Sequence, residues 1–326
     1  MARVLAMSSF VASGHVGLGA VVPGLQALGH EVVALPTILL SNHPGHPRFA
    51  GEAVDPDLLD RMIAALSGGG DAGSVAGVVG EGGGFWPSID AILIGYMPSP
   101  DHVDVAHRTI ELARRKAHRH VPVLCDPIIG DDPSGRYVTE TVAAAIRDRI
   151  MPLADITTPN RFELSWMSGH PVATAADALQ AARMLAIPTV LATSIPIANP
   201  SGDGGDGDSD RHGESAGTTT SRHLANLLYQ RASNPDGALL TTVPRWDGVP
   251  HGTGDLMTAL FLGHLLAGRS APDAAAIAAS GVAAAAEASI GRRELQLVRQ
   301  TSRWAAARPL ALTSLSVDRS ADYRSG

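Results

Sequence analysis

The run His251-Gly-Thr-Gly-Asp255 combines two glycines with a carboxylate and opens a long segment of small and apolar residues. Glycines let the backbone approach a ligand closely, and the free N–H groups at the start of a helix bind anions such as phosphate. A carboxylate beside such a site would repel a phosphate, but it could take a proton from a hydroxyl that attacks a phosphoryl group held there. The same residues also fit a simple capping turn, in which Thr253 caps the helix and Asp255 favours its positive end.

A second group of carboxylates follows an apolar run at residues 121–125, which is typical of a buried strand. The residues Asp126-Pro-Ile-Ile-Gly-Asp131 come directly after this run. Ligands in open α/β sheets bind at the carboxyl ends of strands, so these carboxylates are candidates for a ligand site. Two hard oxygen ligands near a phosphate suit Mg²⁺, which keeps several waters and accepts one or two carboxylates. Asp, Pro and Gly are also ordinary turn residues, and a turn alone explains the composition equally well.

A third segment, Ala154-Asp-Ile-Thr-Thr-Pro-Asn-Arg-Phe-Glu163, passes from a short strand into a helix. Thr158-Pro159 ends the strand, and Asn160 is expected to cap the helix, which puts Glu163 three residues into it. This is the spacing of a capping pair, which requires no function. An acid at this position could equally hold a metal-bound water, and the local sequence leaves both interpretations open.

Three further segments carry weaker signals. Gly14-His-Val-Gly17 follows the first predicted strand, but it does not match the dinucleotide-binding motif GxGxxG. The second predicted strand also lacks an acidic residue at its end, near residues 32–35. A dinucleotide site is therefore not favoured. Ser8 and Ser9 at the end of the first strand could reach a ligand, although a serine there is usually a turn residue. The two histidines of Ser41-Asn-His-Pro-Gly-His46 lack the further spaced ligands that zinc needs.

The segments described above must be held in place by the fold of the chain. Along the sequence, short runs typical of strands alternate with runs typical of helices. This alternation predicts a single domain of the three-layer α/β/α class, a sandwich with a mostly parallel central sheet. Strands are predicted at residues 3–7, 31–35, 91–94, 121–125, 156–157 and 189–192, with a pair at 224–230 and 238–242. Helices are predicted at residues 21–28, 55–67, 103–118, 139–150, 173–186, 253–267 and 271–291, and the chain after residue 253 is expected to be mostly helical.

The length and the net charge of the chain limit the classes of protein to which it can belong. The 326 residues are enough for one large α/β domain spanning 1–326. The formal net charge of −7 offers no basic surplus that would suggest nucleic acid or an anionic membrane as a partner. No signal peptide or membrane-length apolar stretch is recognisable, so a cytoplasmic location is expected.

Two segments and one side chain stand outside this pattern. Residues 67–84 are rich in glycine, and residues 199–221 carry Gly, Ser, Asp and Thr with almost nothing apolar, so both are expected to be flexible surface loops or insertions. The single cysteine, Cys125, lies in an apolar run and is interpreted as a small core side chain.

Taken in order, the motifs resemble those of pyridoxal kinases, which belong to the ribokinase superfamily. The resemblance covers most of residues 3–290 and is carried by Ser9 with Gly14-His-Val-Gly17, Ser41-Asn-His43, Gly95-Tyr96, Cys125-Asp-Pro127 with Gly130-Asp131, Tyr137-Val138, Ala154-Asp-Ile-Thr-Thr-Pro-Asn160 with Phe162-Glu163, Thr193-Ser194 and Gly252-Thr-Gly-Asp255. It implies ATP-dependent phosphorylation of the 5′-hydroxyl of pyridoxal, with pyridoxine and pyridoxamine as further candidate substrates. It also implies Mg²⁺, a monovalent cation (K⁺ or Na⁺) and a homodimer.

The resemblance also implies a role for each matching position. Substrate contacts would come from Ser9, His43, Tyr96 and Asp255. ATP would be bound by Asp126, Asn160, Glu163, Thr193, Ser194, Thr242, Val243, Thr253 and Gly254. Mg²⁺ would be held by Asp131 and Glu163, and the monovalent cation by Asp126, Thr158 and Thr193. Gly252, Thr253 and Gly254 would form an anion hole, and Asp255 would be the base.

The chain departs from the pattern of this family in three places, one of which is a glycine-rich insertion before Ala91 that has no recognisable counterpart. Many relatives carry a threonine after Ser-Asn-His, where this chain has Pro44, which offers neither a hydroxyl nor an N–H. The loop at 131–136 is also shorter than in some relatives. Two alternatives stay open. A hydroxymethylpyrimidine or sugar kinase of the same superfamily would share the glycine turn, and the changes at Pro44 and in the loop leave open a pyridoxal-binding carrier without turnover.

Overall fold

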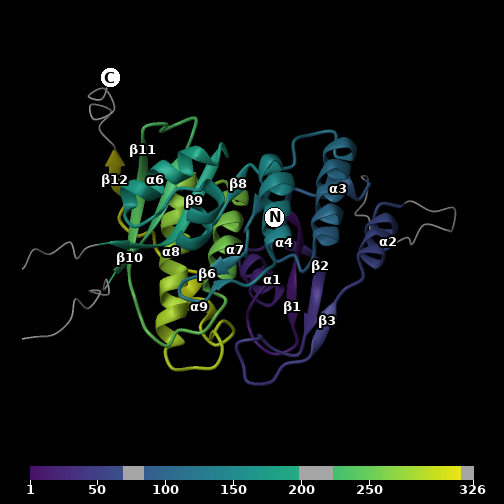
Figure 1. Ribbon diagram of the computed structural model, residues 1–326, viewed down its shortest axis with the longest axis horizontal. Coiled ribbons are helices and arrows are strands. Elements are labelled where there is room, and N and C mark those ends of the chain that lie inside the picture. Colours follow the sequence, from purple (N-terminus) through teal and green to yellow (C-terminus); the bar gives the residue numbers. More distant parts are fainter. Residues whose placement is uncertain (69–83, 198–222, 317–326) are drawn as a thin grey trace, which may run out of the picture.

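The computed structural model describes residues 1–68, 84–197 and 223–316. Within these ranges, ten strands form one sheet in the order β12-β11-β10-β9-β8-β5-β4-β1-β2-β3 (Figure 1). The strands of this sheet are β1 (Arg3–Val11), β2 (Glu31–Leu40), β3 (Gly51–Ala53), β4 (Ala91–Ile94), β5 (Val123–Cys125), β8 (Ile156–Thr157), β9 (Thr189–Ile197), β10 (His223–Gln230), β11 (Gly237–Pro244) and β12 (Thr313–Ser316). A separate small hairpin consists of β6 (Gly130–Asp131) and β7 (Gly135–Arg136).

The centre of the sheet is parallel and its two ends are antiparallel. Strands β2, β1, β4, β5, β8 and β9 pair in parallel, whereas β10, β11 and β12 at one end and β3 at the other pair antiparallel. The mostly parallel sheet and the pairing of β10 with β11 are therefore confirmed. Neither β3 nor β12 is among the predicted strands. Strand β12 lies in the part of the chain after residue 253 that is expected to be mostly helical. Both are short, largely exposed edge strands without an alternating apolar pattern.

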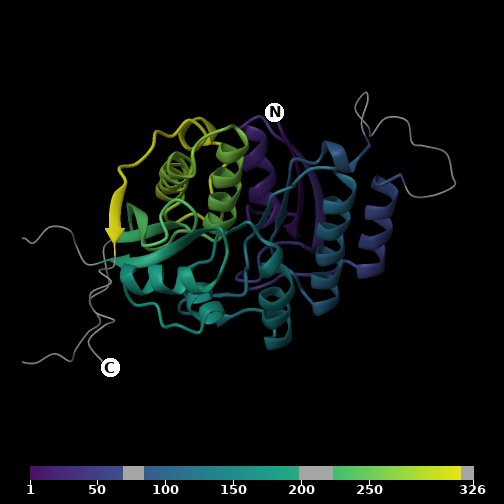
Figure 2. The ribbon, with the colours of Figure 1, turned by 90° about the horizontal axis from the view of Figure 1, so that it is seen from above.

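Helices cover both faces of the sheet, which makes three layers (Figure 2). One face carries α1 (Leu18–Ala27), α7 (Thr253–Leu266), α8 (Ala271–Ala288) and α9 (Thr301–Trp304). The other face carries α2 (Pro56–Leu66), α3 (Pro100–Lys116), α4 (Glu140–Ala145), α5 (Arg161–Ser168) and α6 (Ala175–Met184). A separate cluster of buried apolar side chains fills each interface, and the three-layer α/β/α fold is therefore confirmed.

Most helix bounds agree with the prediction within about three residues, with one clear exception. The helix predicted at 139–150 ends as an α-helix at Ala145, and a π-helical turn, Ile146–Ile150, follows it. A short 3₁₀ turn, Met151–Leu153, then leads into β8. Pro152 lacks the N–H that would continue the helix, which accounts for the change of winding before this residue.

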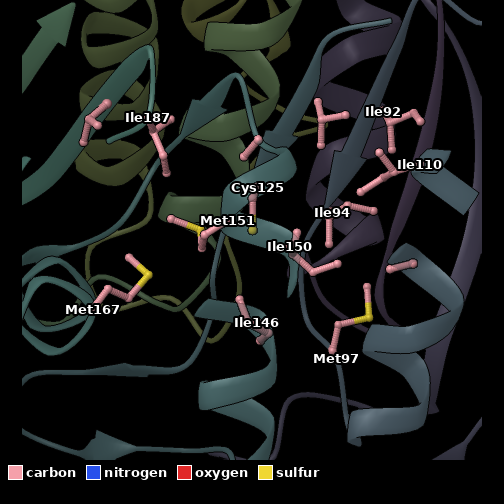
Figure 3. Packing of buried hydrophobic residues seen from close by; sticks show 14 of the residues in the cluster. Ile92, Ile94, Met97, Ile110, Cys125, Ile146, Ile150, Met151, Met167 and Ile187 are labelled. Atoms are coloured by element: carbon pink, nitrogen blue, oxygen red, sulfur yellow. The ribbon is translucent and has the colours of Figure 1, made fainter. Parts of the chain in front are cut away.

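Cys125 lies inside the apolar cluster on the α2–α6 face. Figure 3 shows its side chain among Ile94, Ile150 and Met151. Complete burial raises the pKa of the thiol well above its ordinary value, so the thiol stays protonated. The interpretation of Cys125 as a core side chain is confirmed.

Two predictions fall on segments that the structure does not describe. The loop predicted at 199–221 lies wholly outside the described residues, and so does the loop at 67–84 apart from residues 67, 68 and 84. In the part of the chain that is described, no helix has both the length and the apolar character needed to cross a bilayer.

Candidate active site

The candidate residues gather where the parallel strands end. Strands β1, β4, β5 and β8 run in the same direction, so the segments that follow them leave the sheet at one edge. Asp126 follows β5 and Thr158 follows β8, and both are linked to α7 by hydrogen bonds through Thr258. The structure therefore brings the glycine turn at the start of α7 together with these strand ends.

Asp126 is buried, and helix α7 supplies a hydrogen bond to its carboxylate. Thr258 donates its hydroxyl hydrogen to Asp126 Oδ2 at 2.9 Å, and Thr258 Oγ1 lies 2.8 Å from Thr158 Oγ1. Burial raises the pKa of Asp126 well above its ordinary value, and Glu163 and Asp255 raise it further, whereas the bond from Thr258 lowers it. Thr258 is missing from the residues predicted from sequence. Its position three residues after Asp255, on the same face of the helix, is the signal that could have revealed it.

Glu163 completes a capping box at the start of α5. The Asn160 side chain accepts the Glu163 N–H at 3.0 Å, and Glu163 Oε2 accepts the Asn160 N–H at 3.0 Å. Glu163 Oε1 accepts the N–H groups of Ile129 at 2.9 Å and Gly130 at 3.4 Å. Burial raises the pKa of Glu163 to about 7, although these backbone hydrogen bonds oppose the rise. The capping interpretation is confirmed, and the carboxylate also ties the loop after β5 to α5.

Asp131 lies in the β6–β7 hairpin and adds a further carboxylate to this region. Its Oδ1 accepts the N–H of Asp132 at 2.8 Å, and burial raises its pKa. Charge on Asp131 raises the pKa of Glu163. Among the residues that the structure describes, no group of three or more His, Cys, Asp or Glu side chains is placed to hold a metal ion. The carboxylates of Asp131 and Glu163 are hard oxygen donors of the kind that Mg²⁺ accepts, since it takes one or two carboxylates and completes its shell with water and phosphate oxygens.

Gly252 is the N-cap residue of α7, and its backbone conformation requires glycine. Its φ is 107°, and a Cβ there would lie 2.0 Å from the carbonyl oxygen of His15. The prediction that Thr253 caps the helix is wrong, because Thr253 is the first helical residue and the Leu256 N–H donates to the Gly252 carbonyl at 3.0 Å. The N–H groups of a first helical turn have no partner inside the helix and stay available for an anion. A Cβ on Gly254 would meet no atom within 4 Å, so this residue borders open space.

The carboxylate of Asp255 lies in the first turn of α7, beside the loop that follows β1. The N–H groups of Gly17 and of Asp255 itself lie near it and lower its pKa, but burial has the larger effect and raises the pKa to about 6. Gly17 also packs against Ser9, since a Cβ on Gly17 would lie 2.3 Å from Ser9 Oγ. Gly17 thus contacts both residues, and the predicted base lies close to a predicted substrate contact.

Tyr96 follows β4 and is anchored to the ends of β1 and β2. Its N–H donates to Ser8 Oγ at 3.1 Å, and its carbonyl oxygen accepts the Thr37 hydroxyl at 2.7 Å. Its ring packs, partly buried, against the apolar cluster on the α2–α6 face, and burial raises the pKa of its hydroxyl. Ser8 and Ser9 lie inside β1, because this strand continues to Val11 instead of ending at residue 7 as predicted. Ser8 is buried and holds this backbone, whereas Ser9 stays partly exposed.

His43 lies in the loop between β2 and β3 and contacts the residue that precedes Gly252. Its Nδ1 accepts the N–H of Gly45 at 3.0 Å, and its ring stacks on His251 with centroids 4.2 Å apart and planes inclined by 24°. Burial, together with His251 and His46, lowers the pKa of His43 to about 4, so its ring is neutral near pH 7. The ring stack joins the predicted substrate loop to the glycine turn.

The residues predicted to bind the nucleotide lie further along the same sheet. Thr193 of β9 forms a parallel bridge with Asn160, which places it next to the cap of α5. Ser194 follows with a φ of 59° and is exposed. Thr242 and Val243 lie on β11, with β10 between them and β9. The structure therefore places Thr193 next to the start of α5, where Glu163 lies, and places Thr242 and Val243 two strands away from Thr193.

The chain is similar to known kinases over most of its length. The phosphomethylpyrimidine kinase family model matches residues 87–297. A pyridoxal kinase from Corynebacterium diphtheriae is 32% identical over 86% of this chain and 87% of its own length. A pyridoxal kinase from Bos taurus is 30% identical over 80% and 76% of the two chains. The structure of pyridoxal kinase from Leishmania donovani in complex with ADP and pyridoxine has a TM-score of 0.78 and 26% identity, covering 97% of this chain and 99% of that one.

Proposed function

This chain belongs to the pyridoxal kinase family, and on that premise we propose that it transfers the γ-phosphoryl group of ATP to the 5′-hydroxyl of pyridoxal, with Asp255 as the proton acceptor. The observation that carries this proposal is the carboxylate of Asp255 in the first turn of α7, directly beside a glycine turn suited to an anion. A carrier without turnover would need no base there. Pyridoxine and pyridoxamine are further candidate substrates, since the Leishmania donovani enzyme has been solved with ADP and each of them.

Positioning and charge neutralisation would do most of the catalysis. Ser9, His43 and Tyr96 would hold the pyridine ring and present its hydroxyl to Asp255. The N–H groups of the glycine turn would bind oxygens of the transferring phosphoryl group, where negative charge is concentrated. With a pKa of about 6, Asp255 is ionised near pH 7 and can take the hydroxyl proton as the oxygen attacks.

The clustered carboxylates support binding of cations with the nucleotide. Asp131 and Glu163 would hold Mg²⁺ directly or through water, and Asp126, Thr158 and Thr193 would hold a K⁺ or Na⁺ ion. When bound, these ions offset the negative charge of the triphosphate. Burial raises the pKa values of Asp126 and Glu163, and repulsion from neighbouring carboxylates raises them further. A bound cation relieves this repulsion, which is the physical argument for these sites.

The nucleotide would extend from the glycine turn along β9. It would contact Asn160, Thr193 and Ser194, with Thr242 and Val243 flanking the adenine. The positive φ of Ser194, 59°, supports this placement, because strained backbone of this kind is concentrated at ligand sites.

We further propose that residues 1–326 form one kinase domain that works as a cytoplasmic homodimer. One sheet runs from β1 to β12, which supports a single domain. The later parts of β1 and β2 and the segment leading into β3 expose Phe10, Leu39 and Phe49 by 41%, 47% and 53%, and exposed apolar side chains of this kind suit contact with a second copy. The cytoplasm is the compartment that supplies ATP.

A coupled ATP-consumption assay tests the substrate assignment. The purified protein is supplied with Mg²⁺, K⁺ and, in separate reactions, pyridoxal, pyridoxine, pyridoxamine, the hydroxymethylpyrimidine and ribose. We expect turnover with pyridoxal and a stoichiometric phosphorylated product. Preference for the pyrimidine or for ribose would keep the kinase and replace its substrate. Pyridoxal binding without any turnover would favour the carrier.

The pH dependence of kcat/KM for pyridoxal is expected to fall as the pH drops through about 6. The reason is that burial raises the pKa of Asp255 to about 6, and its protonated form cannot accept the hydroxyl proton. Activity is therefore retained above this pKa and lost below it. The profile is measured from about pH 5 to pH 9, with circular dichroism to verify folding at each pH. A rate that stays level down to pH 5 would exclude Asp255 as the base.

Gly254→Val is expected to lower kcat/KM for ATP on the order of a hundredfold, the scale of losing one donor of an anion hole. The Cβ of residue 254 would meet no protein atom within 4 Å, so the added methyl groups occupy space that the phosphate needs without disturbing the fold. Steady-state kinetics and thermal unfolding measure the two effects. Gly84→Val is the matched control, because a Cβ there meets only Pro87 at an ordinary 3.7 Å, at a position remote from α7. Unchanged kinetics in Gly254→Val would refute this geometry.

A further inference from the structure

Three buried side chains, Thr158, Thr258 and Asp126, form one chain of hydrogen bonds between different parts of the fold. Thr158 Oγ1 and Thr258 Oγ1 are 2.8 Å apart, and Thr258 Oγ1 is 2.9 Å from Asp126 Oδ2. The exposed fractions of Thr158, Thr258 and Asp126 are 5%, 1% and 6%. Solvent therefore contributes little to the hydrogen bonding of this group.

The direction of each hydrogen bond follows from the number of hydrogens. A hydroxyl carries one hydrogen, and an ionised carboxylate only accepts. When Asp126 is ionised, as it would be with a cation bound, Thr258 gives its hydrogen to Asp126, so in the contact between the two threonines Thr158 is the donor. The Thr158 oxygen then keeps its lone pairs for a ligand, because its own hydrogen is directed at Thr258.

The hydrogen bond that Thr258 donates stabilises the ionised form of Asp126. Its carboxylate is repelled by Glu163 on α5 and by Asp255 on α7, and it follows the buried Cys125 on β5. The hydrogen bond from Thr258 is the interaction that favours the charged form of Asp126 against burial and this repulsion. It also fixes the orientation of the carboxylate, which leaves Oδ1 and a remaining lone pair of Oδ2 for other partners.

We propose that Thr258 is a positioning residue for phosphoryl transfer, which orients the Asp126 carboxylate and turns the Thr158 hydroxyl hydrogen away so that both residues present oxygens to a cation bound with the nucleotide. This inference rests on the proposed function, in which Asp126 and Thr158 serve the cation. Thr258 itself contacts neither substrate nor cation.

Thr258→Val and Thr258→Ser form the test pair. Valine keeps the shape of the side chain and removes the hydroxyl, whereas serine keeps the hydroxyl and removes a methyl group. In Thr258→Val we expect ADP, measured by calorimetry, to bind about tenfold to a hundredfold more weakly in K⁺, the range of losing a hydrogen bond to a charged group. Thr258→Ser should bind ADP within about threefold of the wild type, since the hydrogen bond is retained. The KM for pyridoxal should not change in either variant.

Replacing K⁺ by choline separates a positioning role from a structural one. If Thr258 acts through the cation, wild type and Thr258→Val should bind ADP almost equally in choline. A difference of the same size in choline and in K⁺ would overturn the proposal, and so would equal losses in the valine and serine variants. These readouts measure ADP binding, so they remain valid even if the wild type phosphorylates a substrate other than pyridoxal.

A second variant covers the case in which Thr258→Val does not fold. Thr158→Val leaves the hydrogen bond between Thr258 and Asp126 in place and removes only the terminal donor of the chain. It should raise the K⁺ concentration needed for half-maximal ADP binding by about tenfold, within the range expected for one polar contact to a charged group. An unchanged K⁺ dependence in this variant would contradict the assignment of free lone pairs to Thr158.

Discussion

Asp255→Asn is expected to lower kcat by about a thousandfold, within the range attributed to general base catalysis, and to leave ATP binding nearly unchanged. The amide has almost the same shape as the carboxylate and can still accept the N–H of Gly17, so the first turn of α7 should keep its position. It cannot take a proton from the attacking hydroxyl. Steady-state kinetics give kcat, and calorimetry gives the Kd for ATP.

Asp273→Asn is the matched control for this variant. Asp273 is also the third residue of its helix, α8, and its N–H is bonded to the capping residue Ser270, but it is exposed and lies outside the candidate site. Its substitution should leave kcat unchanged. A normal kcat in Asp255→Asn would remove Asp255 from the mechanism, whereas a lost affinity for ATP together with lost kcat would indicate that its role is to hold the glycine turn.

The proximity of several candidate residues could be predicted because the fold places strand ends together. Alternating strand and helix runs predict a parallel sheet, and a parallel sheet brings the residues after β5 and β8 to one edge. Asp126 and Thr158 are therefore neighbours although they are far apart in the chain. Glu163 was open to two interpretations from its spacing, and the structure shows that the capping box is real and that the same carboxylate also binds the loop after β5.

What the sequence could not reveal depends on contacts between distant segments. Thr258 gains its significance from a hydrogen bond to Asp126, a residue on another element. The stacking of His43 on His251 depends on how the loop after β2 folds back on the start of α7. Short edge strands such as β3 carry no periodic pattern, since their pairing is decided by their neighbours in the sheet.

Gly252→Ala is expected to impair both stability and activity, because two independent effects act at this residue. A non-glycine residue at a φ of 107° carries strain of roughly 1–3 kcal/mol. The added Cβ would also lie 2.0 Å from the carbonyl oxygen of His15, which is backbone and cannot move aside like a flexible side chain. We expect a lower free energy of unfolding in urea and a kcat/KM for ATP reduced on the order of a hundredfold, since the proposed anion hole depends on this turn.

Gly254→Ala separates the two effects, because it lies two residues away in the same turn. Its φ is not in the positive range, and its Cβ would meet no atom within 4 Å. Its free energy of unfolding should therefore be no lower than that of the wild type, since alanine favours a helix over glycine, and only the phosphate site should be impaired. Equal stability of Gly252→Ala and the wild type would mean that the loop containing His15 yields easily. In that case the close contact between this loop and the start of α7 would not hold the glycine turn in place. The anion hole would then have to be formed by the helix alone.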